Sequence, residues 1–139
     1  MSTPAETILQ LEGITAGYGK IVALNGIDLR VETGSMVTLL GANGAGKTTT
    51  LKTISGLVRA TGGRVLFEGE DITQTPAHEI ARRGLVHVPE GRHVLRGLSV
   101  RENLELGAFT VKDPALRQKR MKEVFGLFPV LEKRQHGDG

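Results

Sequence analysis

Residues 41–48 read Gly-Ala-Asn-Gly-Ala-Gly-Lys-Thr and match the pattern G-x-x-x-x-G-K-[ST] at every fixed position. Glycines in this pattern let the backbone curl until successive N–H groups point at phosphate oxygens. Lys47 supplies a mobile positive charge that can reach the β- and γ-phosphates of a nucleotide, and the Thr48 hydroxyl can ligate Mg²⁺. The sequence therefore predicts a phosphate-binding loop.

Such a loop needs a buried strand before it and a helix after it. Residues 36–40 are a nearly continuous apolar run, as expected of a strand covered on both faces. Residues 47–55 predict a helix, whose N-terminal end carries about half a positive charge. A glycine-rich turn with an incidental lysine is the alternative, and the strand and helix in register make it the weaker one.

Short strands surround the loop in sequence. Alternating apolar and polar residues at 8–11 and 27–31 predict half-buried antiparallel strands, with a Gly-rich loop at 13–19. Residues 64–67 predict a further strand that ends in a hairpin turn at 68–71. The first part of the chain is therefore expected to be mostly β.

A short helix, one more short apolar strand at residues 85–88 and then two further helices are expected in the second part. Thr75 is expected to cap a short helix that has Pro76 at its first position. Residues 99–102 form a capping box, and Asp113 with the following proline opens the last helix. The apolar face predicted for that last helix consists of Met121, Val124, Phe125 and Phe128.

Composition excludes several classes of protein. The chain has 139 residues, of which 39% are hydrophobic and 24% charged, so it is expected to be globular. It has no cysteine, which excludes disulfides, thiolate zinc sites and a cysteine nucleophile. No apolar run reaches the roughly 18 residues of a membrane span, and residues 1–6 do not resemble a signal peptide. The net charge of +3 does not require nucleic acid as a partner.

The loop motif alone is compatible with kinases, GTPases, helicases and transport ATPases. About forty residues of strand pattern precede it here, whereas small nucleotide kinases carry the loop near the N-terminus. The guanine-reading pattern N-K-x-D is absent from the sequence, which argues against a GTPase.

The order of these motifs resembles the ATP-binding subunit of ABC transporters, and most of all that of the branched-chain amino acid importers. The resemblance implies an α/β P-loop NTPase fold with an N-terminal antiparallel β-subdomain. Residues from about 6 to 90 would form the β-subdomain and P-loop core, and those from about 91 to 135 the start of a helical subdomain. The matching stretches are residues 17–24, 41–57, 67–72, 87–92 and 100–104.

The resemblance also implies roles for single residues. Tyr18 takes the place of the aromatic residue that stacks on adenine in this family, although a surface tyrosine in a turn is the alternative. Glu90 stands where most members carry a glutamine that contacts Mg²⁺ and the attacking water, and here it matches the branched-chain subfamily. A solvated turn residue is the alternative for Glu90. The catalytic candidates are Lys47 and Glu90, the metal candidates Thr48 and Glu90, and the cofactor-binding candidates Tyr18, Gly41, Asn43, Gly44, Ala45, Gly46, Lys47, Thr48 and Thr49.

The cofactors implied are ATP and Mg²⁺, and the partners are transmembrane permease subunits and a second ATP-binding subunit, with no nucleic acid. The family brings the region of Arg92, His93 and Arg96 against the permease, although a solvated basic loop is an equal interpretation. The resemblance thus implies a cytoplasmic subunit on the inner face of the membrane that couples ATP hydrolysis to the import of branched-chain amino acids. The rival hypotheses are a nucleotide-binding module without hydrolysis and another P-loop NTPase or kinase.

Three family features are not found in the 139 residues: the Leu-Ser-Gly-Gly signature, an apolar strand ending in Asp-Glu, and a downstream histidine. The resemblance therefore predicts an incomplete domain, the N-terminal portion of such a subunit. It also predicts that this chain alone does not turn over ATP at a useful rate.

Overall fold

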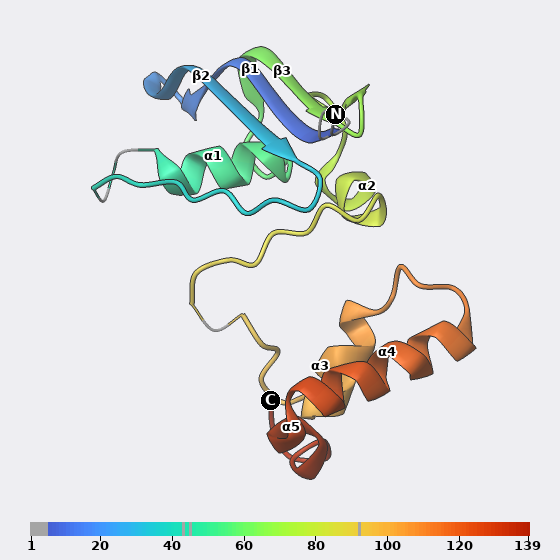
Figure 1. Ribbon diagram of the computed structural model, residues 1–139. Coiled ribbons are helices and arrows are strands. Elements are labelled where there is room, and N and C mark those ends of the chain that lie inside the picture. Colours follow the sequence, from blue (N-terminus) through green and yellow to red (C-terminus); the bar gives the residue numbers. More distant parts are fainter. Residues whose placement is uncertain (1–5, 43, 45, 92) are drawn as a thin grey trace. The chain divides into compact units, whose positions relative to one another are not determined.

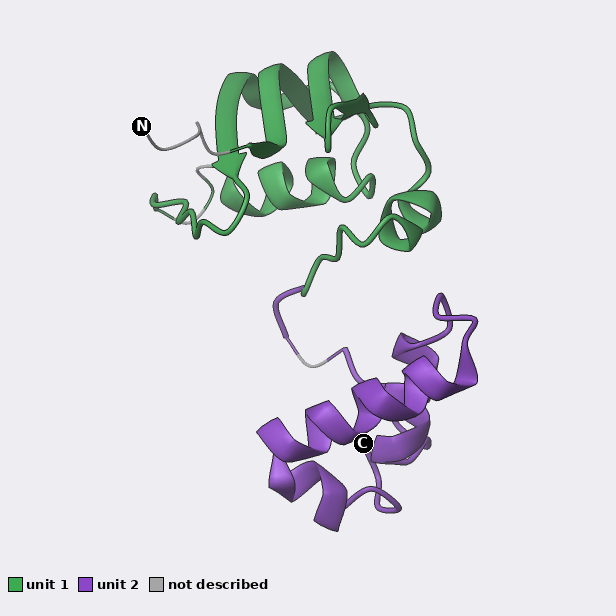
Figure 2. Cartoon of the chain, turned by 45° about the vertical axis from the view of Figure 1, so that its right-hand side comes forward, with its two compact units in different colours: residues 1–88 green, residues 89–139 purple. Residues whose placement is uncertain are grey.

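The computed structural model describes residues 6–42, 44, 46–91 and 93–139. The chain divides into two compact units, residues 1–88 and residues 89–139, which are described separately (Figure 2). The elements described in the first unit are four strands and two helices, and those of the second unit are three helices.

The first unit is built on an antiparallel sheet with the strand order β2-β1-β3-β4 (Figure 1). Because β1 pairs with both β2 and β3, the three long strands form one continuous sheet with β1 in the middle. This confirms the antiparallel N-terminal part of the predicted α/β fold, and the hairpin expected at residues 68–71 is present. The strands are β1 (Thr7–Tyr18), β2 (Ile21–Glu32), β3 (Ala60–Phe67) and β4 (Glu70–Asp71).

The Gly-rich loop expected at residues 13–19 is wrong for most of its length, because β1 continues to Tyr18. Gly13 has a φ of 56°, and its N–H donates to Asp28 Oδ1 at 2.8 Å, at an irregularity in the β1–β2 pairing. Glycine adopts this left-handed conformation without the Cβ penalty, so the strand accommodates a bulge instead of ending. The chain turns only at residues 19–20, which leaves Tyr18 at the end of the hairpin.

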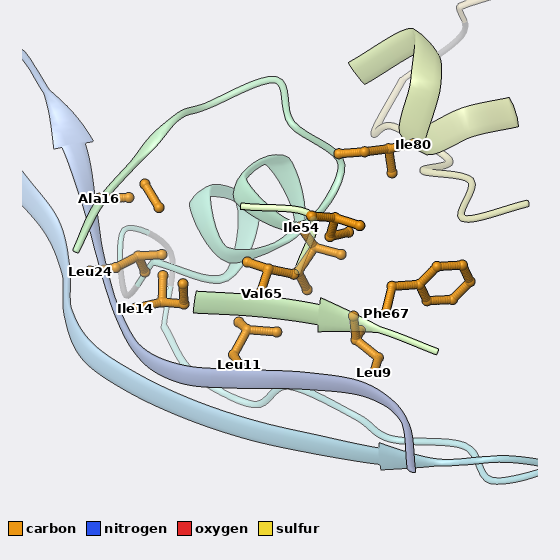
Figure 3. Packing of buried hydrophobic residues seen from close by; sticks show 11 residues of the cluster. Leu9, Leu11, Ile14, Ala16, Leu24, Ile54, Val65, Phe67 and Ile80 are labelled. Atoms are coloured by element: carbon orange, nitrogen blue, oxygen red, sulfur yellow. The ribbon is translucent and has the colours of Figure 1, made fainter. Parts of the chain in front are cut away.

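Two helices complete the core of the first unit, α1 (Lys47–Ile54) and α2 (Ala77–Arg82). Ile54 from α1 and Ile80 from α2 are buried in one hydrophobic cluster with residues of the sheet (Figure 3). Full burial of an Ile or Leu side chain contributes about 1.5–3 kcal/mol. Pro76 lies at the N-cap of α2 and not at its first position, so the expected Thr75 cap is wrong by one residue. The cluster comprises Leu9, Leu11, Ile14, Ala16, Leu24, Ile54, Ala60, Val65, Phe67, Ile72 and Ile80.

Two predicted strands, residues 36–40 and 85–88, do not form in the described structure. Both segments are irregular chain, and several of their apolar side chains are exposed. A strand that is apolar on both faces is stable only between neighbouring strands and beneath covering helices. None of the described strands pairs with either segment, so the apolar pattern alone was insufficient.

The helices of the second unit begin where the sequence predicts. Ser99 Oγ accepts a hydrogen bond from the Glu102 N–H at 3.1 Å, and Glu102 Oε2 accepts one from the Ser99 N–H at 2.8 Å. This capping box is confirmed, and a Ser or Thr cap stabilises a helix by about 0.5–2 kcal/mol. Asp113 caps the next helix as expected, because its Oδ1 accepts from the Ala115 N–H at 3.0 Å. The helices are α3 (Val100–Gly107), α4 (Pro114–Leu127) and α5 (Pro129–Lys133).

The apolar face predicted for the last helix is only partly buried. Phe125 is buried, and Met121 and Val124 are half-buried. Phe128 is exposed and lies outside α4, because Pro129 starts the separate helix α5. Because the proline ends α4, Phe128 does not lie on the apolar face of α4 that its spacing predicted.

A turn closed by the side chain of Asp71 joins β4 to α2 and makes part of the stability of the fold depend on pH. Asp71 Oδ1 accepts hydrogen bonds from the Thr73 hydroxyl and from the Thr73 N–H, the latter at 2.9 Å. These hydrogen bonds, the hydroxyl's first, hold the pKa of Asp71 below its ordinary value of 3.8. Because the folded pKa is the lower one, the charged turn stabilises the fold above the ordinary pKa. That stabilisation is lost as the pH falls through the folded pKa.

We therefore expect Asp71→Asn to lower the melting temperature at neutral pH, with the difference from the wild type shrinking below the ordinary pKa of the aspartate. Thermal unfolding followed by circular dichroism over a pH series measures this. A difference that stays constant down to the acid limit would show that the charge of Asp71 is irrelevant to stability.

Candidate functional site

The glycine-rich loop is shaped by two backbone conformations that favour glycine. Gly44 and Gly46 have φ values of 87° and 90°, and Gly46 is the N-cap of α1. A Cβ on Gly46 would lie 2.8 Å from Leu24 Cδ2 and 3.1 Å from the Ala23 carbonyl oxygen. The loop therefore packs directly against β2, and a side chain at residue 46 would force it away.

A hollow of about 200 Å³ opens where the loop enters α1. The first N–H groups of a helix have no intrahelical acceptor, and they lie at the positive end of the helix dipole. An anion at this point would therefore meet unpaired donors. The volume is below the roughly 300 Å³ at which small-molecule pockets begin, so the hollow suits phosphate groups better than a whole nucleotide. Its lining residues are Ala23, Gly44, Gly46, Lys47, Thr48 and Thr49.

Larger hollows of about 290, 450 and 430 Å³ lie along α3 and α4 and beside the β3–β4 turn. Glutamate side chains line each of them, together with arginines. The lining of the hollow at α1 combines backbone donors, hydroxyls and a lysine, and includes no carboxylate. We place the site at this smaller hollow because the chemistry of its lining, and not its size, matches an anion.

Lys47 is held over the loop that precedes it. Its Nζ donates a hydrogen bond to the Gly41 carbonyl oxygen, at the first residue of the motif, and the side chain is half-buried. The ammonium group thus lies beside the first residue of the loop and is already oriented by one acceptor. A phosphate oxygen in the hollow would compete with that carbonyl for the same ammonium group.

The structure brings Tyr18 beside the start of α1. The Tyr18 hydroxyl lies 3.5 Å from Thr49 Oγ1, although the two residues are 31 positions apart in sequence. The Tyr18 ring is half exposed, whereas Thr49 is buried. Because the Thr49 hydroxyl faces Tyr18, any contact of Thr49 with a phosphate would come from its backbone N–H.

The remaining predicted site residues divide into three groups. Thr48 is exposed at the first turn of α1 and lines the hollow, where its hydroxyl is accessible to a cation. Asn43 and Ala45 lie outside the described residues. Glu90 belongs to the second unit, so its predicted part in Mg²⁺ binding stays a prediction. Within the described residues there is no cluster of three or more His, Cys, Asp or Glu suited to a metal. Mg²⁺ bound to nucleotides takes few protein ligands and completes its shell with phosphates and water.

Sequence reasoning missed Ala23, which lines the hollow, and Gly17, which lets the hairpin close. A Cβ on Gly17 would lie 1.9 Å from the Ile21 carbonyl oxygen, so only glycine permits the two strands to approach this closely. The run Gly-Tyr-Gly-Lys at residues 17–20 could have indicated this hairpin. A two-residue turn at residues 19–20 returns the chain past Tyr18 and places residue 23 near the loop.

Comparison with known proteins gives a consistent result. A family model described as ABC transporter matches residues 24–137. The high-affinity branched-chain amino acid transport ATP-binding protein BraG of Pseudomonas aeruginosa is 43% identical over 128 residues, which cover 91% of this chain and 54% of BraG. The lipopolysaccharide export system ATP-binding protein LptB of Haemophilus influenzae is 38% identical over 116 residues, covering 84% of this chain and 48% of LptB.

Solved structures agree with the sequence comparison. The structure of an ATP-binding subunit of an ABC transporter superposes with a TM-score of 0.82 at 30% identity, covering 94% of this chain and 54% of that one. The chain spans about half the length of the curated relatives it matches. Of the helices in the described part, none is long and apolar enough to cross a membrane.

Proposed function

The chain belongs to the ABC transporter family, and from this premise we propose that it binds Mg²⁺-ATP as the nucleotide-binding part of a transport ATPase. The observation that carries the proposal is the hollow at the start of α1, where loop glycines, Lys47 and two threonines form a lining without a carboxylate. Because the chain belongs to this family, the rival hypothesis of an unrelated P-loop kinase is excluded.

The residues present fit a triphosphate. The loop and the first turn of α1 offer N–H donors, and Lys47 would exchange the Gly41 carbonyl for a phosphate oxygen. The exposed Thr48 hydroxyl would hold Mg²⁺, which neutralises charge on the phosphates. The half-exposed ring of Tyr18 lies beside this hollow and would offer a flat face to the adenine.

Tyr18→Ala is expected to weaken the binding of ATP and of adenosine alike, by roughly tenfold, since base–aromatic stacking contributes about 1–3 kcal/mol. Tyr18→Phe is expected to bind nearly as the wild type does, because the ring is retained and the hydroxyl makes only a 3.5 Å contact with Thr49. Calorimetric titration with each ligand measures both variants. Normal binding by Tyr18→Ala would leave Tyr18 as a surface residue of the turn.

We infer binding without useful turnover for these 139 residues. Phosphoryl transfer needs charge neutralisation and a positioned water. Lys47, Thr48 and Mg²⁺ would supply the first. Glu90 is assigned to Mg²⁺ by resemblance, and a metal-bound carboxylate is a poor general base. The absence of an effective general base lowers the rate of phosphoryl transfer by about 10²–10⁴-fold.

Phosphate release from the purified chain tests this, with Lys47→Ala as the control for contaminating ATPases. We expect equal, low rates for the two proteins. Turnover of about 1 s⁻¹ or faster that Lys47→Ala abolishes would show that the chain positions its own catalytic base.

We propose branched-chain amino acids as the cargo and permease subunits on the inner face of the membrane as the partners. The support is the match to BraG, which extends over more of this chain and at higher identity than the match to LptB. Residues 90–103 are the proposed contact with the permease, with Glu90 at the start and the capping box of α3 at the end. In this arrangement a second ATP-binding subunit would complete the transporter.

A photo-crosslinking residue at Arg96 tests the contact. In cells that co-express a branched-chain amino acid permease, we expect adducts with that permease from Arg96 and none from the exposed Lys133 on α5. Equal adducts from both positions would reject a specific contact. Adducts with lipopolysaccharide export components and not with the amino acid permease would reject the cargo.

A further inference from the structure

The side chain of Asn103, in α3, closes a turn that precedes the helix. Its amide pairs with both backbone groups of Leu95, because Asn103 Oδ1 accepts from the Leu95 N–H at 2.8 Å and Nδ2 donates to the Leu95 carbonyl at 3.2 Å. The same Nδ2 lies 3.4 Å from the Leu98 carbonyl oxygen and 3.0 Å from that of Ser99. One amide group therefore holds both ends of residues 95–98.

An asparagine is suited to these contacts and poorly suited to the helix that carries it. A carboxylate accepts hydrogen bonds but donates none, and an aliphatic side chain does neither, whereas the amide does both. Asparagine is an unfavourable residue inside a helix, because its side chain competes for backbone groups. Asn103 nevertheless lies inside α3, which begins at Val100. The hydrogen bonds to the turn explain why an asparagine occupies this position.

The two ends of the turn are not held equally. The Leu98 carbonyl also accepts from the Gly139 N–H at 3.0 Å, so the end next to α3 has a second support. Within the residues that the structure describes, the Leu95 N–H has no acceptor other than Asn103 Oδ1. Loss of the Asn103 amide would therefore release the Leu95 end of the turn first.

The turn that Asn103 closes has Arg96 at its tip. The Leu98 N–H donates to the Leu95 carbonyl at 3.3 Å, and Gly97 has a φ of 88°, which glycine adopts without the Cβ penalty. The Arg96 side chain is exposed. The contacts of Asn103 with the turn are all with backbone atoms, so they fix the turn and leave the Arg96 side chain free to meet a partner.

We propose that Asn103 is a positioning residue, which holds Arg96 where it contacts the permease. The inference rests on the permease contact proposed above for residues 90–103. It gives Asn103 the task of shaping the turn, and it gives the contact itself to the tip. A turn without this amide would sample many backbone conformations, and ordering them on docking would weaken the contact.

Amide hydrogen exchange followed by NMR tests the positioning in the purified chain, without a permease. Asn103→Ala is expected to speed exchange at Leu95 by about fivefold, which corresponds to the loss of one hydrogen bond. The Val100 N–H, which donates to the Gly137 carbonyl at 2.9 Å, is expected to exchange as in the wild type. The helical circular dichroism signal is expected to stay the same or to increase, because alanine is the better helix former.

Photo-crosslinking from position 96 tests the consequence in cells that co-express the amino acid permease. Asn103→Ala is expected to lower the adducts by about fivefold or more, because the released turn samples many conformations. Asn103→Asp is expected to lower them as much, since a carboxylate keeps an acceptor for the Leu95 N–H but loses the donor for the three carbonyls. Glu105→Ala is the matched control on the same helix. It removes a hydrogen bond of 3.0 Å from Arg101 and is expected to change neither the adducts nor the exchange at Leu95.

The outcomes separate the positioning role from the permease contact. Wild-type adduct levels in Asn103→Ala or Asn103→Asp, or unchanged exchange at Leu95 in Asn103→Ala, would overturn the role of Asn103 and leave the contact intact. Fewer adducts together with a weaker helical signal would also overturn it, because Asn103 would then support α3 and not the turn. An equal fall in Glu105→Ala would show that any change in α3 has this effect. A wild type without adducts would reject the contact, and the inference with it.

Discussion

Lys47→Ala should weaken the binding of Mg²⁺-ATP by about 10- to 100-fold, because a charge-assisted hydrogen bond to phosphate contributes about 1.5–3 kcal/mol. The expectation rests on the position of Lys47, whose ammonium group lies over the loop and donates to the Gly41 carbonyl. Alanine removes the charge and leaves the backbone donors of the loop in place, so weak binding should persist. Calorimetric titration of ATP into the two proteins measures the difference.

Lys52→Ala is the matched control. Lys52 lies in the last turn of the same helix, so its loss changes the net charge equally but acts at the opposite end of α1. We expect its ATP affinity to stay within about threefold of the wild type, since Lys52 is not among the residues that line the hollow. Equal affinity in Lys47→Ala and the wild type would reject the assignment of the site. Equal losses in the two variants would mean that net charge, and not position, governs binding.

Gly63→Ala should destabilise the first unit by about 3 kcal/mol or more, the range of severe single substitutions. Gly63 lies in β3 with a φ of 77°, and a Cβ there would stand 2.4 Å from the carbonyl oxygens of both Glu12 and Gly13. Both contacts are with backbone, so no side-chain rotation relieves them. The variant must therefore break part of the β1–β3 pairing to accommodate a methyl group.

The neighbouring glycine supplies the contrast. A Cβ on Gly62 would lie 3.5 Å from Thr15 Cβ, an ordinary van der Waals contact, and its φ is not in the left-handed region. We expect Gly62→Ala to change stability by less than about 1 kcal/mol. Urea unfolding followed by circular dichroism gives both values. Equal urea midpoints for the two variants would show that β3 accommodates a methyl group at residue 63 without loss of stability.

Local interactions were predictable from the sequence in this chain. The helix after the loop, the capping box at Ser99, the Asp113 cap and the hairpin at residues 68–71 each depend on residues a few positions apart, and all are present. The strands at residues 36–40 and 85–88 were not predictable in this way. Their apolar pattern specifies burial between neighbours, and the pattern does not reveal whether those neighbours are present.

The candidate site shows the same division. The phosphate-binding loop is a contiguous motif, and its position before α1 follows from the sequence. The approach of Tyr18 to Thr49 depends on β1 continuing through Gly13 and Gly17, where glycine spacing alone predicted a loop. A glycine can either allow a bulge or end a strand, and the sequence alone does not tell these two roles apart. In this chain only the pairing of β1 with β2 distinguishes them.

The small hollow beside a half-exposed aromatic ring would divide the proposed recognition of a nucleotide unequally between its phosphates and its base. Lys47, Thr48 and the N–H donors at the start of α1 would all act on the phosphates, whereas the base would meet the half-exposed face of Tyr18. Stacking tolerates any flat base, because it reads no hydrogen-bonding pattern. A site of this kind distinguishes triphosphate from monophosphate more sharply than adenine from guanine. Its preference for ATP would then come from the relative abundance of nucleotides in the cell more than from contacts with the base.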